Sequence, residues 1–297
     1  EVYRYALVAG TVAKNHDFDV IHAHDWLTYS AGIIAKKISG KPLIVHVHAT
    51  EYDRGGEFNR NTLVYDIEKR GMEAADRVVT VSNWTRNIVI EKYGIPAEKV
   101  ITVHNAVDFK TDTEDREERG IKDKIVTFLG RITLQKGPEY FVEAAAKVMK
   151  RLPNVRFVMA GSGEKMNPLV RRVAQLGLGT RFHFTGFLRG NDVQRMFRYS
   201  DVYVMPSVSE PFGISPLEAM RSGVPTIISK QSGVAEVLHH AIKVDYWDIN
   251  ALADAIYGVL AYPTLSNFMQ REGYEEVNQL KWETASLKLK KIYESLM

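Results

Sequence analysis

Two glutamates, Glu210 and Glu218, stand eight residues apart around a turn that contains Pro211 and Gly213. Residues 215–221 follow with a helical pattern and a proline in the first turn. Such a turn directs free backbone N–H groups toward a ligand, which suits a diphosphate. Glu218 in the first helical turn can accept hydrogen bonds from a ribose diol, and Glu210 can reach a sugar hydroxyl. The bland alternative is a capped helix with two surface glutamates, but the whole string favours the functional interpretation.

Two cations share a second short loop. Arg131 and Lys136 lie five residues apart after the apolar run 125–129, and Gly130 allows the backbone to turn. Two cations are costly to bring together unless an anion lies between them, and a diphosphate would serve. A basic loop that faces water explains this loop equally well when it is taken alone. Gly161 belongs to half of a glycine fingerprint, so it either lines a nucleotide or makes a simple tight turn.

Four of the nine histidines form two His-x-His pairs, His22 with His24 and His46 with His48. In a strand, residues i and i+2 share a face, so four imidazoles could ligate zinc. No carboxylate pattern of a zinc hydrolase accompanies them, and we expect them to line a polar cleft. The Asp-x-Asp pair at residues 17–19 precedes a strand and is interpreted as turn chemistry. We therefore expect no metal site.

The composition excludes several classes of protein. The chain has 297 residues, 45% of them hydrophobic, which is more apolar material than a disordered chain carries. Lysine and arginine total 39 against 36 acidic residues, and a net charge of +3 argues against a nucleic-acid binder. The absence of cysteine excludes disulfides, thiolate nucleophiles and cysteine-based zinc sites. No apolar run is long enough to span a membrane.

Short apolar runs alternate with longer helical stretches along the chain, which predicts βαβ units and parallel sheets. The expected strands are residues 19–22, 42–46, 77–81, 99–103, 125–129, 155–159, 181–185, 202–205 and 226–228. The expected helices include residues 27–37, 61–75, 83–92, 138–150 and 215–221. A charged stretch at 109–124 divides the pattern, so we expect two doubly wound α/β domains. Ligands of such folds bind at the carboxyl ends of the strands.

Several motifs together resemble one family. They are Ser-Glu-Pro-Phe-Gly at 209–213 with Leu-Glu-Ala-Met at 217–220, and Gly-Arg at 130–131 with Gln-Lys-Gly at 135–137. Less specific similarities lie at 20–26, 48–53, 75–82 and 103–108. These stretches are similar to the retaining glycosyltransferases of family 4, the glycogen-synthase-like group, which have the GT-B fold. The resemblance implies two Rossmann-like domains with parallel sheets that face a cleft.

The family resemblance implies the role of each part of the chain. Residues 1–108 would be a partial acceptor-side domain, 109–124 a linker, 125–280 the nucleotide-sugar domain and 281–297 a terminal helix that crosses back to the first domain. Relatives begin with a strand and a Gly-Gly loop, so the resemblance implies an N-terminally truncated chain that binds a nucleoside diphosphate but transfers sugar poorly.

The resemblance also implies the site. Arg131 and Lys136 would hold the diphosphate, Glu218 the ribose and Glu210 the donor sugar, with His48 near the reacting centre. The remaining donor-binding candidates are Gly130, Gly161, Phe212, Gly213, Ile214, Ser215 and Leu217. No cofactor is implied beyond the donor substrate, a UDP- or ADP-sugar.

The implied reaction is hexosyl transfer, with glucose as the expected sugar, to an α-glucan or another glycan in the cytoplasm. Three alternatives stay open. The acceptor could be a lipid-linked or cell-envelope glycan, reached by a peripheral membrane contact. The chain could bind sugar nucleotides without catalysis, or it could be a zinc hydrolase that uses the histidine pairs.

Overall fold

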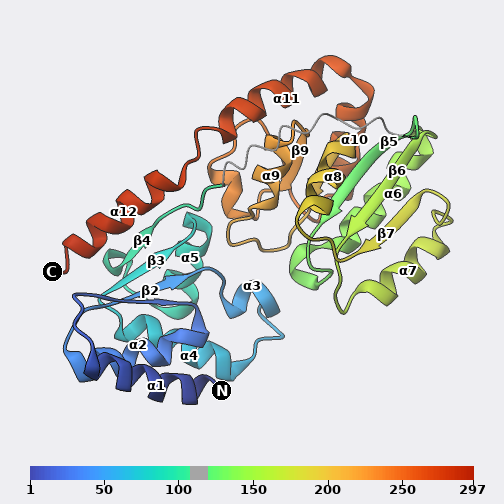
Figure 1. The fold of residues 1–297 in the computed structure, drawn as a ribbon. Helices are drawn as coiled ribbons and strands as arrows, with labels where there is room; N and C mark the ends of the chain where they lie inside the picture. Colours follow the sequence, from blue (N-terminus) through green and yellow to red (C-terminus); the bar gives the residue numbers. More distant parts are fainter. Residues whose placement is uncertain (108–119) are drawn as a thin grey trace. The chain divides into compact units, whose positions relative to one another are not determined.

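The computed structural model describes residues 1–107 and 120–297, which form two compact units (Figure 1). Unit 1 comprises Glu1–Ala106 together with Lys281–Met297, and unit 2 comprises Val107–Leu280. The linker predicted at 109–124 lies mostly outside the described residues, and its last residue, Lys124, already belongs to the first strand of unit 2.

Unit 1 contains one parallel sheet of four strands in the order β1-β2-β3-β4. Its strands are β1 (Ile21–His24), β2 (Leu43–Val47), β3 (Arg77–Thr80) and β4 (Val100–Thr102). Its helices are α1 (Val2–Asn15), α2 (Trp26–Ser39), α3 (Glu51–Gly55), α4 (Thr62–Ala74), α5 (Asn83–Tyr93), the short η1 (Ala97–Lys99) and α12 (Trp282–Glu294). The first strand begins two residues later than the sequence predicts.

The two faces of this sheet are covered by different parts of the chain. Alternate residues of β2 point to opposite faces. Leu43 and Val45 pack in a core with residues of α2, α4 and α5. Ile44 packs on the opposite face with Ala285 and Ile292 of α12. The C-terminal helix therefore contributes to the core of unit 1, and Figure 1 shows it across the sheet from α2 and α4.

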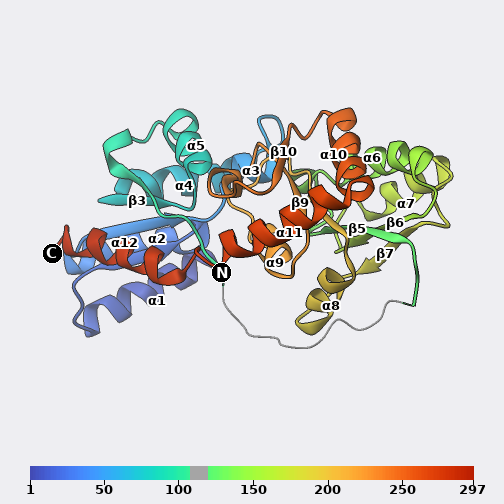
Figure 2. The ribbon, with the colours of Figure 1, turned by 90° about the horizontal axis from the view of Figure 1, so that it is seen from above.

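Unit 2 contains a parallel sheet of six strands in the order β10-β9-β8-β5-β6-β7. The strands are β5 (Lys124–Leu129), β6 (Val155–Ala160), β7 (Phe182–Gly186), β8 (Val202–Met205), β9 (Thr226–Ser229) and β10 (Ile242–Val244). The helices are α6 (Pro138–Arg151), α7 (Met166–Gln175), α8 (Asn191–Tyr199), α9 (Ser215–Arg221), α10 (Ile249–Ala261), α11 (Pro263–Val277) and the short η2 (Leu134–Lys136) and η3 (Gly233–Glu236). Figure 2 gives a second view of these elements.

The strand order of unit 2 creates a switch point. The chain proceeds from β5 to β6 and β7 on one side, then returns to place β8, β9 and β10 on the other side. The loops that follow β5 and β8 therefore leave neighbouring strands in opposite directions. Open α/β sheets bind ligands at this position, outside the carboxyl ends of the strands.

Candidate functional site

An ion pair joins the two loops at the switch point of unit 2. The Lys136 ammonium, after β5, donates a short hydrogen bond to the Glu210 carboxylate, after β8. The Ser207 hydroxyl donates to the same carboxylate oxygen at 3.2 Å. The lysine and glutamate side chains are only 20% and 7% exposed. The structure thus brings together two predicted site residues that lie 74 positions apart in sequence.

Backbone contacts fix the position of Glu210. Its N–H donates to the carbonyl of Gln231 at 3.0 Å, and its carbonyl accepts from the N–H of Gly233 at 2.9 Å. Gly213 has a φ of +100°, and a Cβ there would lie 3.2 Å from the Glu210 Cγ. A side chain at Gly213 would therefore strain the backbone and crowd the Glu210 side chain.

Glu218 differs from Glu210 in its environment. It lies in the first turn of α9, as predicted, and burial raises the pKa of its carboxyl group. Among the described residues its carboxylate forms no ion pair within 4.0 Å. On the same helix, the Ser215 hydroxyl lies 2.7 Å from the buried Tyr203 hydroxyl. Glu218 is therefore a partly desolvated carboxylate that a ligand hydroxyl can satisfy.

The other candidates around α9 fall into two groups. Phe212 and Leu217 are buried, which leaves only their backbone for a ligand, whereas Ile214 is 42% exposed.

Arg131, in the loop after β5, is exposed, and it donates to the Gln135 side-chain oxygen at 3.2 Å rather than to an acidic residue. Its guanidinium therefore keeps donors available for an anion.

The glycines after β5 and β6 allow two backbones to pack closely. Gly130 donates to the carbonyl of Ala160 at 3.0 Å, and Ile132 donates to that of Ser162 at 2.9 Å. A Cβ on Gly161 would lie 1.9 Å from the Gly130 oxygen. The absence of a side chain at Gly161 therefore allows the loop that carries Arg131 and Lys136 to pack against the end of β6. Gly161 thus has a packing role.

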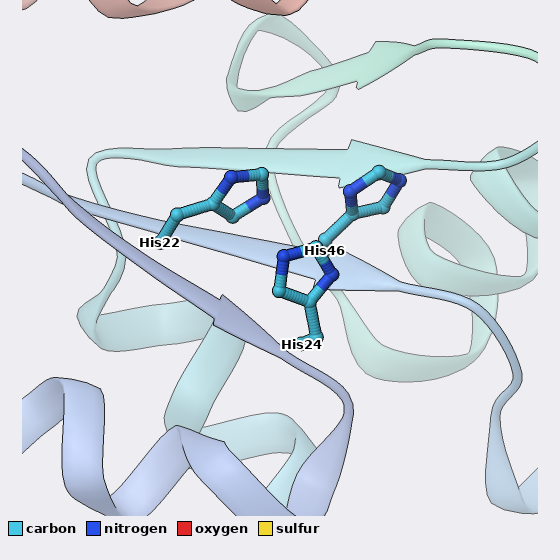
Figure 3. Close-up of side chains that lie close together, drawn as sticks. All are labelled: His22, His24 and His46. Carbon is cyan, nitrogen blue, oxygen red and sulfur yellow. The ribbon is translucent and has the colours of Figure 1, made fainter. Parts of the chain in front are cut away.

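Unit 1 carries a stack of four imidazoles at the carboxyl ends of β1 and β2. Ring centroids of neighbours in the stack are 4.3–5.4 Å apart, and the rings are within 30° of parallel. His24 Nδ1 lies 2.9 Å from His48 Nε2, and His22 Nδ1 lies 2.6 Å from the Tyr293 hydroxyl of α12. Figure 3 shows His22, His24 and His46 facing one another from the two strands.

The environment favours the uncharged form of His22, His24 and His46. Burial, reinforced by the neighbouring imidazoles, lowers the pKa of His46 to about 2 and that of His22 to about 4. Burial and His48 also lower the pKa of His24. At neutral pH these three rings therefore offer nitrogen lone pairs instead of positive charge.

The sequence analysis missed Asp25 as the residue that positions His48. The Asp25 carboxylate accepts from the N–H groups of His48 at 2.8 Å and of Ala49 at 3.4 Å. Asp25 has a φ of +58°, the only positive φ of a non-glycine residue in the described ranges. A strained aspartate directly after a strand suggests a functional constraint, and its position after His24 could have revealed it.

A buried charge network follows His48. Thr50 and Asp53 form a capping box that begins α3. The Glu68 carboxylate of α4 accepts from the backbone N–H of Glu51 at 2.9 Å and pairs with Arg54. This network anchors α3, and with it the segment that carries His48.

Two family models match the chain. Residues 111–276 match the family model described as Glycosyl transferases group 1, and residues 2–111 match the model described as Glycosyltransferase Family 4. The chain belongs to these glycosyltransferases. The resemblance found in the sequence motifs is thereby confirmed.

Three relatives illustrate the range of the family. An uncharacterized glycosyltransferase of Methanocaldococcus jannaschii is 34% identical over 239 residues, which are 76% of this chain and 61% of the relative. The UDP-Gal:alpha-D-GlcNAc-diphosphoundecaprenol alpha-1,3-galactosyltransferase of Escherichia coli is 28% identical over 74% of this chain and 60% of its own. The glycogen synthase of Mycobacterium tuberculosis (strain H37Rv) is 23% identical over 93% and 68%. The chain thus spans about three-fifths of the length of two of these relatives.

Solved structures show the same fold. Sucrose-phosphate synthase of Thermosynechococcus elongatus has a TM-score of 0.81 and 22% identity, over 99% of this chain and 78% of the other. HepE of Anabaena, solved with UDP and glucose, has the same TM-score and identity over 98% and 81%. The glycosyltransferase therefore has the GT-B fold with two Rossmann-like domains. None of the helices in the described ranges has the length and apolar character needed to cross a bilayer.

Proposed function

We propose that the protein transfers a hexosyl group, with glucose as the preferred sugar, from a UDP- or ADP-sugar to a glycan acceptor with retention of the anomeric configuration. The observation that carries this proposal is the Lys136–Glu210 pair at the switch point of unit 2. One cation and one carboxylate meet where a doubly wound sheet binds nucleotides.

A donor substrate would separate this ion pair and give each residue a new partner. Its diphosphate offers Lys136 a doubly charged partner, and Arg131 on the same loop adds a planar donor group. Glu210 is then free to accept from hydroxyls of the donor sugar. Lys136 and Arg131 stabilise the charge that develops on the leaving diphosphate in the transition state.

The ribose and the sugar pocket complete the proposal. Glu218 accepts hydrogen bonds from the ribose diol, which satisfies a carboxylate that burial otherwise penalises. The role expected for His48 in unit 1 stays a prediction, and Asp25 holds the backbone of His48 in place. Since Lys136 and Arg131 supply the positive field, we expect transfer to survive EDTA, and complete inhibition that Mn²⁺ reverses would contradict this mechanism.

A lipid-linked acceptor is the second candidate. The Escherichia coli relative is named for transfer to a diphosphoundecaprenol-linked sugar, so the family includes such acceptors. Parallel assays with an oligoglucan and with a polyprenyl-diphosphate sugar in vesicles distinguish the two.

Titration calorimetry with UDP, ADP and GDP, next to these transfer assays, tests the function. We expect this chain to bind UDP or ADP measurably and to transfer labelled sugar to one of the two acceptors. A homologous glycosyltransferase with the same site residues serves as the positive control. Binding by this chain without any turnover would favour a sugar-nucleotide binder, and no binding to any nucleoside diphosphate would refute the proposal.

A further inference from the structure

The imidazoles of unit 1 have a feature that donor binding does not explain. Both ring nitrogens of His46 and Nε2 of His22 are buried without a hydrogen-bond partner among the described residues. His46 is only 5% exposed. An unsatisfied buried polar group costs stability unless a ligand completes it, so these nitrogens point to a missing partner.

The strand register brings three of these rings together. His24 of β1 pairs directly with His46 of β2, and His22 lies two residues earlier on the same face of β1. One nitrogen from each of the three rings lies within 4.8 Å of the others. Figure 3 shows the three side chains converging on one region from two neighbouring strands.

We propose that His22, His24 and His46 bind one transition-metal ion of the zinc class. Imidazole is a preferred ligand of Zn²⁺ and Co²⁺, and three protein ligands leave a fourth position for water. This site belongs to unit 1, and its three proposed ligands are none of the residues that the proposed function assigns to the donor, so each proposal can fail without the other. His48, which contacts His24, is the one residue that both proposals mention.

Outer contacts suit two of the rings for this role. Metal-ligating histidines characteristically donate the other ring N–H to a fixed acceptor. His22 Nδ1 has the Tyr293 hydroxyl and His24 Nδ1 has His48 Nε2 as such partners. In the tautomers that donate these bonds, Nε2 of each ring carries its lone pair toward the ion.

Binding requires a modest closure of the cluster. Tetrahedral ligands at about 2.05 Å from zinc lie roughly 3.4 Å from one another. The nitrogens must therefore approach by up to about 1.4 Å from their 4.8 Å separation. The second side-chain torsion of histidine has a broad minimum, so ring rotation can supply this movement.

Cobalt substitution tests the site directly on the whole chain after treatment with a chelator. We expect one Co²⁺ per chain with the visible absorption of a tetrahedral complex, its displacement by Zn²⁺, and a rise in Tm with Zn²⁺. His22→Gln and His46→Gln should each weaken binding at least tenfold. Tyr293→Phe removes only an outer contact, so we expect about a tenfold loss from that variant.

Matched controls separate the cluster from adventitious binding. His16, which is exposed directly after α1, and His183, on β7, lie outside the cluster, so His16→Gln and His183→Gln should leave Co²⁺ binding unchanged. Circular dichroism checks the fold of each variant, and His22→Gln decides the matter if His46→Gln unfolds. Absence of the tetrahedral spectrum, or binding unaffected in both His22→Gln and His46→Gln, would overturn the proposal.

Discussion

The carboxyl ends of the two parallel sheets hold different kinds of polar group. In unit 2, a lysine and a glutamate from neighbouring loops are paired before any ligand arrives. In unit 1, imidazoles from neighbouring strands are uncharged, and several of their nitrogens have no partner among the described residues. Both units have βα architecture, but the carboxyl end of the unit 2 sheet presents charged groups and that of the unit 1 sheet presents uncharged nitrogens with lone pairs.

This difference has a physical consequence for ligands. A charged ligand can displace one member of the Lys136–Glu210 pair and satisfy both groups through its phosphates and hydroxyls. The unit 1 cluster repels cations only weakly because its rings are neutral, so it suits a neutral sugar edge or a metal ion.

The largest effect is expected for Lys136→Ala. The substitution removes the cation proposed for the diphosphate and leaves a nearly buried glutamate without its partner. We expect kcat/KM for sugar transfer to fall by about 10²–10³-fold, as for loss of a preorganised electrostatic group. Steady-state kinetics of the variant and of the parent protein measure this loss.

Lys230→Ala is the matched control for this change. Lys230 also pairs with an acidic residue of unit 2, Asp245 at 2.8 Å, but it does so near the surface. Its loss should leave kcat/KM nearly unchanged. Equal losses in both variants would show that Lys136 acts through general charge and not at the site.

A smaller effect, with an unusual sign for stability, is expected for Glu218→Gln. The ribose contacts weaken, so donor affinity should fall about 10–100-fold, corresponding to hydrogen bonds to a charged group. Burial raises the pKa of Glu218. Its contribution to stability is therefore complete below the pKa of the unfolded chain and is lost as pH rises through the folded-state pKa.

Urea unfolding at two pH values checks this sign. At pH 7 the variant should be more stable than the parent, because it no longer buries an ionised carboxylate. Near pH 4 the difference should shrink. Glu275→Gln, on an exposed part of α11, serves as control, and a variant destabilised at pH 7 would assign Glu218 a structural role.

Much of this architecture is legible in the sequence, because buried parallel strands are continuous β-branched runs. Residues 202–205 and 215–221 were predicted with the bounds that β8 and α9 have. The prediction for β1 was two residues early, since His24 interrupts the apolar run while remaining in the ladder. The strand β10 was not predicted, because Lys243 interrupts its short apolar run, whereas the equally short β4 contains no charged residue.

The site was predictable in residue type but not in pairing. Lys136 and Glu210 meet only because β5 lies next to β8, and that strand order is a property of the whole sheet. Similarly, the sequence shows two histidine pairs, but the register that places His24 beside His46 is a tertiary fact. The candidate groups therefore come from local patterns, and packing decides which of them touch.

The pH dependence of stability should reveal the uncharged imidazoles of unit 1. The folded pKa values of His22 and His46, about 4 and about 2, lie below the ordinary value of 6.5. As pH falls below about 6.5, the unfolded chain takes up protons that the folded chain refuses, so the metal-free protein should lose stability. The groups facing these two rings are His24, His48 and Tyr293.

Unfolding of the metal-free chain between pH 7.5 and 5 measures this loss. His22→Gln removes one of the depressed groups, so its stability should depend less steeply on pH than that of the parent. His183→Gln, in unit 2, should keep the parent slope. Identical slopes in His22→Gln and the parent would mean that His22 titrates normally in the folded protein.

The smallest effect is expected for Gly130→Ala, in the loop that carries the cations. The atoms nearest to a Cβ at this position would be Lys136 side-chain carbons at 3.7–3.9 Å, an ordinary contact, and the φ of Gly130 is not positive. The glycine is therefore not required by the turn, contrary to the reason given from sequence. We expect a change of no more than about 0.5 kcal/mol in the free energy of unfolding.

Gly161→Ala is the comparison variant, for which we expect a large effect, because Gly161 packs directly on Gly130. Its Cβ would lie 1.9 Å from the Gly130 carbonyl oxygen, and its φ of +144° is one that alanine rarely adopts. The backbone must shift, at a cost of about 1–3 kcal/mol, and the cationic loop must move with it. Nucleoside-diphosphate affinity should consequently fall in Gly161→Ala and persist in Gly130→Ala. If the two variants unfold at the same urea concentration, the close backbone packing of β5 and β6 is not what positions Lys136.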